Sequence, residues 1–219
     1  MITYEQVKSN EELKTYIRMA DESLANMGFT EHSFAHVTYV AETAKRILLT
    51  LGYSTRQAEL AQIAAYMHDI GNIINRTDHA HNGAIMAYKL LNDMKADVAD
   101  IAIIINAIGN HDEKTAFAIN PITASMIIAD KSDVRRTRVR NQNEKNFDIH
   151  DRVNHSVKKS SLNIQKEKSE IELKLKIDTE ECPVMDYFEI FLDRMVLCRH
   201  AAEKLGCEFR LTINDHNIL

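Results

Sequence analysis

The chain has 219 residues, of which 45% are hydrophobic and 27% are charged, with a formal net charge of -5. It is long enough to bury one substantial core, and its acidic balance excludes the strongly basic surface of a general nucleic-acid binder. The apolar runs are far shorter than the roughly 18 residues that a membrane span needs. The N-terminal segment has no signal-peptide pattern, and three cysteines without a C-x-x-C pair predict no disulfides. We therefore expect a cytoplasmic protein without membrane or stable nucleic-acid partners.

Apolar residues recur at three- and four-residue steps through about residue 140, which is the helical period. The pattern predicts helices at about 33–51, from the Ser54-Thr55 cap to Gly71, at 79–91, at 98–108, and from Pro121 through to Arg136. We therefore expect residues 1–150 to form a helical bundle.

The period changes after about residue 150. Apolar and polar residues alternate at 162–164 and 171–177 around a charged K-E-K-S turn, which predicts a β-hairpin. Residues 184–205 return to the helical period, and residues 207–213 alternate again as a strand. The predicted fold is thus mainly α, with a β-β-α-β subdomain at 151–219. Three strands and a helix are marginal alone, so this subdomain needs the bundle or a second subunit, and a homodimer is one option.

Histidines and aspartates gather at the ends and on the apolar faces of the predicted helices. Six of them would supply four imidazoles and two carboxylates to a metal: His36, His68, Asp69, His79, His111 and Asp130. Such a set without thiolates favours iron or manganese, with zinc, nickel and magnesium as further options. Six ligands exceed what one four-coordinate zinc uses. A carboxylate that bridges two ions would explain the number, and Asp69 is the natural bridge.

Each of these residues also has an ordinary structural explanation. A lone histidine such as His36 is more often a core or surface residue, and His68-Asp69 could cap a helix. Asp130 in an apolar helix is costly to bury unless it meets a metal or a cation such as Lys131 or Arg135. These explanations would all have to hold at once, so the joint pattern favours a metal centre.

Five short motifs carry the candidate ligands. They are H-V-T-Y-V-A at 36–41, M-H-D-I-G-N at 67–72, H-A-H-N-G-A at 79–84, G-N-H-D-E at 109–113 and A-D-K-S-D at 129–133. Over about residues 30–140 this arrangement resembles the HD superfamily of metal-dependent phosphohydrolases, which implies a five-helix bundle. The six-ligand version is similar to the subset with two metal ions. That subset has a histidine four residues before a Gly-Ala pair, which favours His79 and leaves His81 as the alternative.

The resemblance implies hydrolysis of a phosphoester or phosphoanhydride by a metal-activated water. The substrate would be a nucleotide or another small phosphate compound. Asp69 and Asp133 are the expected catalytic residues, with Asp133 orienting the water or a ligand. The candidate substrate contacts are Asn72, Arg76, Lys131 and Arg135. Asn72 replaces a lysine that often follows H-D-x-G, and no G-Y-P segment follows His111, so a cyclic di-GMP phosphodiesterase is not expected.

Two other functions stay open at this point. One is a di-iron oxygenase with the same ligand set, and the other is a non-catalytic regulatory or binding domain of the HD type. The basic run at 135–140 could hold nucleotide phosphates, although a solvated helix face is the commoner explanation. Tyr39, Tyr66 and Phe117 could stack on a base or belong to the core.

Overall fold

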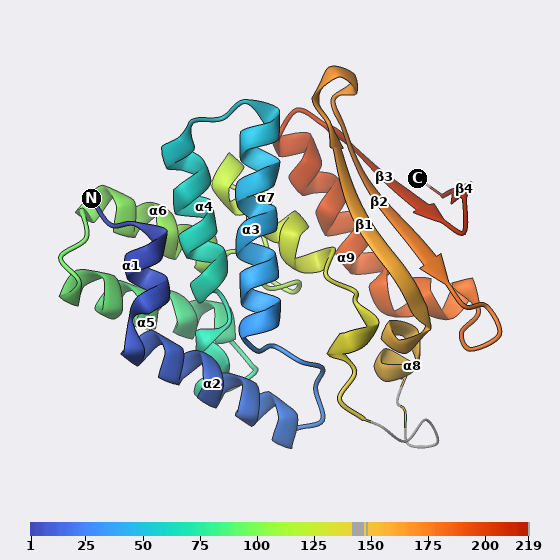
Figure 1. The fold of residues 1–219 in the computed structure, drawn as a ribbon, viewed down its shortest axis with the longest axis horizontal. Coiled ribbons are helices and arrows are strands. Elements are labelled where there is room, and N and C mark those ends of the chain that lie inside the picture. Colours follow the sequence, from blue (N-terminus) through green and yellow to red (C-terminus); the bar gives the residue numbers. More distant parts are fainter. Residues whose placement is uncertain (142–146, 148, 219) are drawn as a thin grey trace.

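The computed structural model describes residues 1–141, 147 and 149–218. Most of these residues are helical, and a four-stranded sheet lies near the C-terminus (Figure 1), which confirms the mainly α fold. The elements of the bundle are α1 (Tyr4–Ser9), α2 (Glu11–Asn26), α3 (Phe34–Leu51), α4 (Thr55–Met67), η1 (Ile70–Ile73), α5 (His79–Asp93), α6 (Val98–Gly109), α7 (Pro121–Lys131) and η2 (Arg136–Arg138). They are followed by α8 (Ile149–Ser156), β1 (Val157–Gln165), η4 (Lys166–Lys168), β2 (Glu170–Ile177), α9 (Val184–Lys204), β3 (Glu208–Ile213) and β4 (His216–Asn217).

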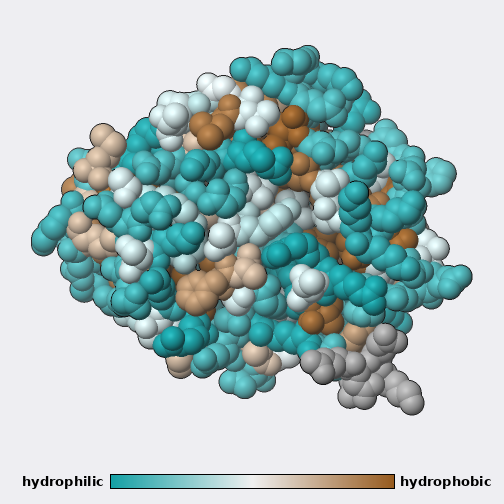
Figure 2. Space-filling model, viewed as in Figure 1, coloured by the Kyte–Doolittle hydropathy of each residue, from teal (hydrophilic) through white to brown (hydrophobic). Residues whose placement is uncertain are grey.

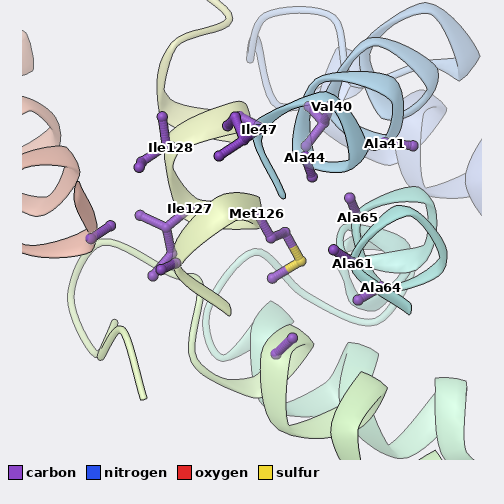
Figure 3. Close-up of a cluster of buried hydrophobic side chains, with 14 of the residues drawn as sticks. Val40, Ala41, Ala44, Ile47, Ala61, Ala64, Ala65, Met126, Ile127 and Ile128 are labelled. Carbon is purple, nitrogen blue, oxygen red and sulfur yellow. The ribbon is translucent and has the colours of Figure 1, made fainter. Parts of the chain in front are cut away.

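The core of the bundle lies between α3, α4 and α7, which pack against one another. Figure 3 shows Ala61 and Ala65 of α4 beside α3, while Met126 of α7 points toward these alanines and Ile127 lies on the opposite side of α7. Small side chains let the helices approach closely, and interiors are packed almost without voids. N-caps define the helix starts. The side chain of Ser33 accepts a hydrogen bond from the backbone N–H of Ala35, and Ser54 forms a capping box with Gln57.

Several boundaries differ from the sequence prediction. The second predicted helix ends at Met67 and continues as η1, and α7 ends at Lys131 instead of running to Arg136. The 16-residue helix α2, the short helices α1 and α8 and the strand β4 were not predicted individually. Strand β1 begins at Val157, five residues before the predicted alternation at 162.

The sheet has the order β1-β2-β3-β4. Strands β1 and β2 form an antiparallel hairpin, whereas β2 and β3 are parallel and are connected through α9. This confirms the β-β-α-β order. Helix α9 packs on α7 on one side and on β3 on the other, so it joins the sheet to the bundle. Buried residues of both parts form one continuous core, and the predicted boundary at residue 150 falls inside α8.

Most of the surface drawn in Figure 2 is hydrophilic, with apolar side chains in separate groups. Among the helices of the described chain, none is both long and apolar enough to cross a membrane. The cysteines at 182, 198 and 207 are buried and unpaired.

Candidate metal centre

The structure brings the six candidate ligands together at one end of the bundle. His36 lies on α3, His68 is the C-cap of α4, and Asp69 follows it directly. His79 is the first residue of α5, His111 follows the end of α6, and Asp130 lies on α7. The four histidines and Asp69 are buried, and the side chain of Asp130 is 11% exposed.

Asp69 lies between two groups of imidazoles. Its Oδ2 is 3.0 Å from Nε2 of His68 and 3.6 Å from Nε2 of His36. Its Oδ1 lies on the side of the other two histidines, 3.7 Å from Nε2 of His79 and 3.9 Å from Nε2 of His111. The two oxygens of one carboxylate therefore face two different pairs of imidazole nitrogens. Asp130 completes the first group, with Oδ1 3.4 Å from Nε2 of His36.

All four imidazoles present the same nitrogen, Nε2, to this centre. Nδ1 of His68, His79 and His111 contacts the backbone carbonyls of Ala65, Arg76 and Ile108 at 2.7, 3.0 and 2.6 Å. A carbonyl oxygen can only accept, so Nδ1 of each ring donates its hydrogen and Nε2 keeps a lone pair. The lone pair on Nε2 of His79 accepts from Nη1 of Arg76 at 3.3 Å. Nδ1 of His36 donates in the same way to Oδ2 of Asp133 at 2.8 Å. Histidines that bind metals are held in this manner.

Several donor atoms of the centre lack hydrogen-bond partners, and a metal ion would supply the missing interaction. Nε2 of His36, Nε2 of His68 and Oδ2 of Asp69 are buried without a hydrogen-bond partner, which is costly in a protein interior. Nε2 of His79 lies 3.2 Å from Nε2 of His111, although two lone pairs repel at that distance. Two donors that are each about 2.1 Å from one ion lie roughly 3.0–3.4 Å apart at ordinary ligand angles. Three of the donor pairs lie in this range: His68 with Asp69 at 3.0 Å, His79 with His111 at 3.2 Å and His36 with Asp130 at 3.4 Å. A bound cation would satisfy these atoms with little movement.

Two glycines allow the segment after α4 to approach α5. A Cβ atom on Gly71 would lie 2.0 Å from the carbonyl oxygen of His79 and 2.5 Å from the backbone nitrogen of Gly83. A Cβ atom on Gly83 would lie 3.1 Å from the carbonyl oxygen of His68. Only hydrogen fits at Gly71, so the H-D-I-G motif can bring His68 and Asp69 against His79.

Metal binding needs neutral imidazoles and ionised carboxylates. The pKa directions of His111, Asp69 and Asp130 suit this requirement, whereas that of His68 favours the charged ring. Burial, together with the neighbouring His68 and His79, holds the pKa of His111 well below its usual range. Burial opposes ionisation of Asp69 and Asp130, but His68 and Lys131, respectively, outweigh it, so the pKa of each carboxyl lies well below its usual value. The pKa of His68 is raised, because Asp69 outweighs the effect of burial.

Side chains behind the centre hold its members in place. Asp133 is fully buried, contacts Nδ1 of His36, and accepts from Arg135 Nε at 2.5 Å and Nη2 at 2.9 Å. Burial opposes ionisation of Asp133, but Arg135 and His36 lower its pKa. The amide of Asn72 donates to Oδ1 of Asp69 at 2.8 Å. Asn72 and Arg135 therefore contact the two aspartates, whereas the sequence analysis placed them against the substrate.

A cavity of about 550 Å³ opens onto the centre, a size typical of small-molecule sites. Its walls include Asp69, His79, His111 and Asp130, and the predicted contacts Arg76 and Lys131. The other lining residues are Met27, Gly28, Phe29, Thr30, His32, Glu113, Lys114, Arg138, Asp151, Asn154, Phe191 and Arg194.

The three aromatic residues that the sequence analysis considered for stacking on a base do not line this cavity. Tyr66 is buried edge-on against Tyr4, Tyr39 lies under the guanidinium of Arg135, and Phe117 is exposed. Phe29 and Phe191, which the sequence analysis missed, line the cavity instead, and the guanidinium of Arg76 lies 5.6 Å from the ring centroid of Phe29.

The basic run at 135–140 is used mainly for internal contacts. Arg138 donates to the carbonyls of Glu31 and Asp133, and Arg140 donates to the carbonyl of Phe29. These contacts hold the loop between α2 and α3 that forms one wall of the cavity. Of this run, only Arg138 lines the cavity.

The structure separates the two histidines that the sequence left as alternatives. His79 is buried in the centre, whereas the side chain of His81 is 57% exposed and lies near Asp78. The sequence analysis missed His32, whose Nδ1 lies 2.7 Å from the carbonyl oxygen of Thr30 and whose ring packs on His36. His32 lies before Ser33, the N-cap of α3, so helical spacing from His36 could not have indicated it.

Comparison with known families agrees with this geometry. The family model of the HD domain matches residues 33–153. The chain belongs to the HD domain family. HD domains bind divalent metals, and two groups of the described residues are spaced to hold an ion, namely His36, His68 and Asp130, and His68, Asp69 and His111. The family match includes all six candidate ligands and Asp133, and it stops before α9.

Among solved structures, the chain is similar to a predicted HD superfamily hydrolase from an uncultured Thermotogales bacterium. The identity is 27% and the TM-score is 0.44, over 57% of this chain and 67% of that chain. No curated protein matches the chain.

Proposed function

We propose that the chain is a metal-dependent phosphohydrolase with two metal ions. The observation that carries the proposal is the set of four Nε2 atoms around Asp69, each with its Nδ1 held by an acceptor. His36, His68 and Asp130 would hold one ion, and His79 and His111 the other. Asp69 would bridge them, because its two oxygens face the two groups. The mixed imidazole and carboxylate donors favour iron or manganese.

The ions, when bound, would lower the pKa of a water molecule toward neutrality and neutralise phosphate charge. The chain itself would position the reactants. Asp133 fixes the ring of His36 and Asn72 fixes the carboxylate of Asp69, so neither group has to reorganise during the reaction. Arg76 and Lys131 on the cavity wall would bind the phosphate oxygens of a nucleotide or another small phosphate compound.

The charge of the cavity suits an anionic substrate such as a phosphate compound. Five cationic side chains line it: Arg76, Lys114, Lys131, Arg138 and Arg194. Four carboxylates also line it, of Asp69, Glu113, Asp130 and Asp151, and two of these are proposed metal ligands. The complete donor set also argues against a purely regulatory domain that has lost its metals.

The test is elemental analysis of the purified protein, followed by assays of nucleotides, dinucleotide polyphosphates and simple phosphoesters with added Mn²⁺ or Fe²⁺. We expect about two ions per chain, and Asp69→Ala should lose metal and activity together. Asp93→Ala is the control, because Asp93 pairs with Lys89 on the surface, where ion pairs contribute little. Full phosphatase activity in Asp69→Ala would refute the assignment, and oxygen uptake without phosphate release would favour the oxygenase.

A further inference from the structure

The C-terminal subdomain reaches the cavity through α9. Phe191 and Arg194 of this helix line the same cavity as Asp69, His79 and His111, although the family match ends at residue 153. Helix α9 packs along α7, which carries Asp130 and Lys131, and this packing brings Arg194 to the centre. The subdomain thus forms part of the wall of the proposed active site.

Arg194 belongs to a cluster in which two cations share one carboxylate oxygen. Oε1 of Glu113 lies 2.5 Å from Nε of Arg194 and 3.7 Å from Nζ of Lys131. Lys131 is buried and also contacts Oδ2 of Asp130 at 2.7 Å. When Asp130 ligates a metal, its charge is engaged by the ion, and the two cations then face the single charge of Glu113. The cluster would therefore carry an excess positive charge at the cavity wall.

The guanidinium of Arg194 is held in a defined orientation. Its central carbon lies 4.6 Å from the ring centroid of Phe191, which is fully buried, and a fixed planar guanidinium is well suited to phosphate oxygens. The side chain of Arg194 remains 25% exposed. It is therefore accessible to a ligand in the cavity and does not serve only as a buried ion pair.

On the basis of the proposed phosphohydrolase function, we propose that Arg194, with Lys131, binds a phosphate oxygen of the substrate, and that the subdomain thereby completes the active site. The bound phosphate competes with Glu113 for the guanidinium. The alternative role of Arg194 is purely structural, as an ion pair that fastens α9 to the loop after α6.

Two substitutions separate these roles, because they break the same ion pair from opposite ends. Arg194→Gln removes the cation, whereas Glu113→Gln removes its competitor. The measurements are the affinity for inorganic phosphate by calorimetry, with Mn²⁺ and after chelation, the KM and kcat for an aryl phosphate, the affinity for Mn²⁺, and the melting temperature. Arg199→Gln is the matched control, since Arg199 is exposed on the same helix.

We expect Arg194→Gln to weaken phosphate binding and raise KM by roughly 10- to 100-fold, the loss of one charge-assisted contact. Arg194→Lys should recover part of this loss, and Glu113→Gln should strengthen phosphate binding. Mn²⁺ affinity should change little in all three variants, and Arg199→Gln should match the unchanged chain.

The inference is overturned if Arg194→Gln and Glu113→Gln lower the melting temperature alike and leave phosphate affinity unchanged. If Arg194→Gln does not fold, Glu113→Gln decides, because unchanged or weaker phosphate binding there contradicts competition. Failure of the proposed function looks different, since the unchanged chain would then hydrolyse no phosphate compound. Loss of phosphate binding in Arg194→Gln would in that case still support the anion site.

Discussion

Gly71→Ala tests whether close packing of the H-D-I-G segment on α5 builds the metal centre. The added Cβ would lie 2.0 Å from the carbonyl oxygen of His79, whereas real Cβ atoms essentially never come within 3.0 Å of such an atom. The obstructing atom is backbone, so no side chain can rotate away, and η1 must move by about 1 Å relative to α5. This movement would separate Asp69 from His79.

The expected cost of this overpacking is about 1–3 kcal/mol, which lowers the melting temperature by roughly 2–12 °C in a chain of this size. Activity should fall more steeply, since a misplacement of about 1 Å can cost roughly 100-fold in rate. Scanning calorimetry, metal titration and phosphatase assays would measure the three effects. Gly109→Ala is the control, because its Cβ would only contact Cβ of Ala84 at 3.7 Å. Equal melting temperatures and metal affinities in the two variants would refute the reasoning.

Three further outcomes follow from the structure. Asp133→Asn should weaken metal binding by about 10- to 100-fold, as expected for a partner of a metal-binding histidine, and metal titration with equal affinities would contradict its contact with His36. Chelation should lower the melting temperature by roughly 5–11 °C for each ion that was present at about 100 times its Kd, with recovery on adding the metal back. Identical melting curves would argue against a structural contribution of the ions. Burial raises the pKa of the Cys198 thiol from 9.0 to about 12. The thiol of the unfolded chain therefore ionises first, so stability should fall as pH rises above 9, and it should fall less in Cys198→Ala. Rapid reaction of Cys198 with a thiol reagent in the folded state would show that it is not buried.

The helices were predictable where local signals set them. Caps at Ser33 and Ser54 and Pro121 at the first turn of α7 place helix starts within a residue or two of the expected positions. The predicted end of α7 was wrong because Asp133, inside the predicted helix, contacts His36 instead, and Arg138 just beyond it donates to the carbonyl of Glu31. Those partners are distant in sequence, so no local pattern reports them.

The candidate ligands were easier to predict than the substrate contacts, for a physical reason. Buried histidines and aspartates in apolar helices are costly without a metal, so residue type alone gives a signal. A cationic side chain is common on any protein surface, so residue type alone does not show whether it binds a substrate or pairs with a carboxylate. Arg135 was expected at the substrate but pairs with Asp133, whereas Arg194, which the sequence analysis did not single out, lines the cavity.

The end of a helix serves two purposes in this centre. The last carbonyls of a helix lack backbone donors, and His68 and His111 each donate from Nδ1 to a carbonyl three residues earlier, at Ala65 in the last turn of α4 and Ile108 in the last turn of α6. His68 is therefore a helix cap, as its position suggests, and the same hydrogen bond leaves Nε2 free to bind a metal. A histidine three residues after an apolar residue at a helix end is thus held in the ligand tautomer by local structure alone. The long-range fold then has only to bring such ends together, which the contact of Gly71 with α5 achieves for His68, Asp69 and His79.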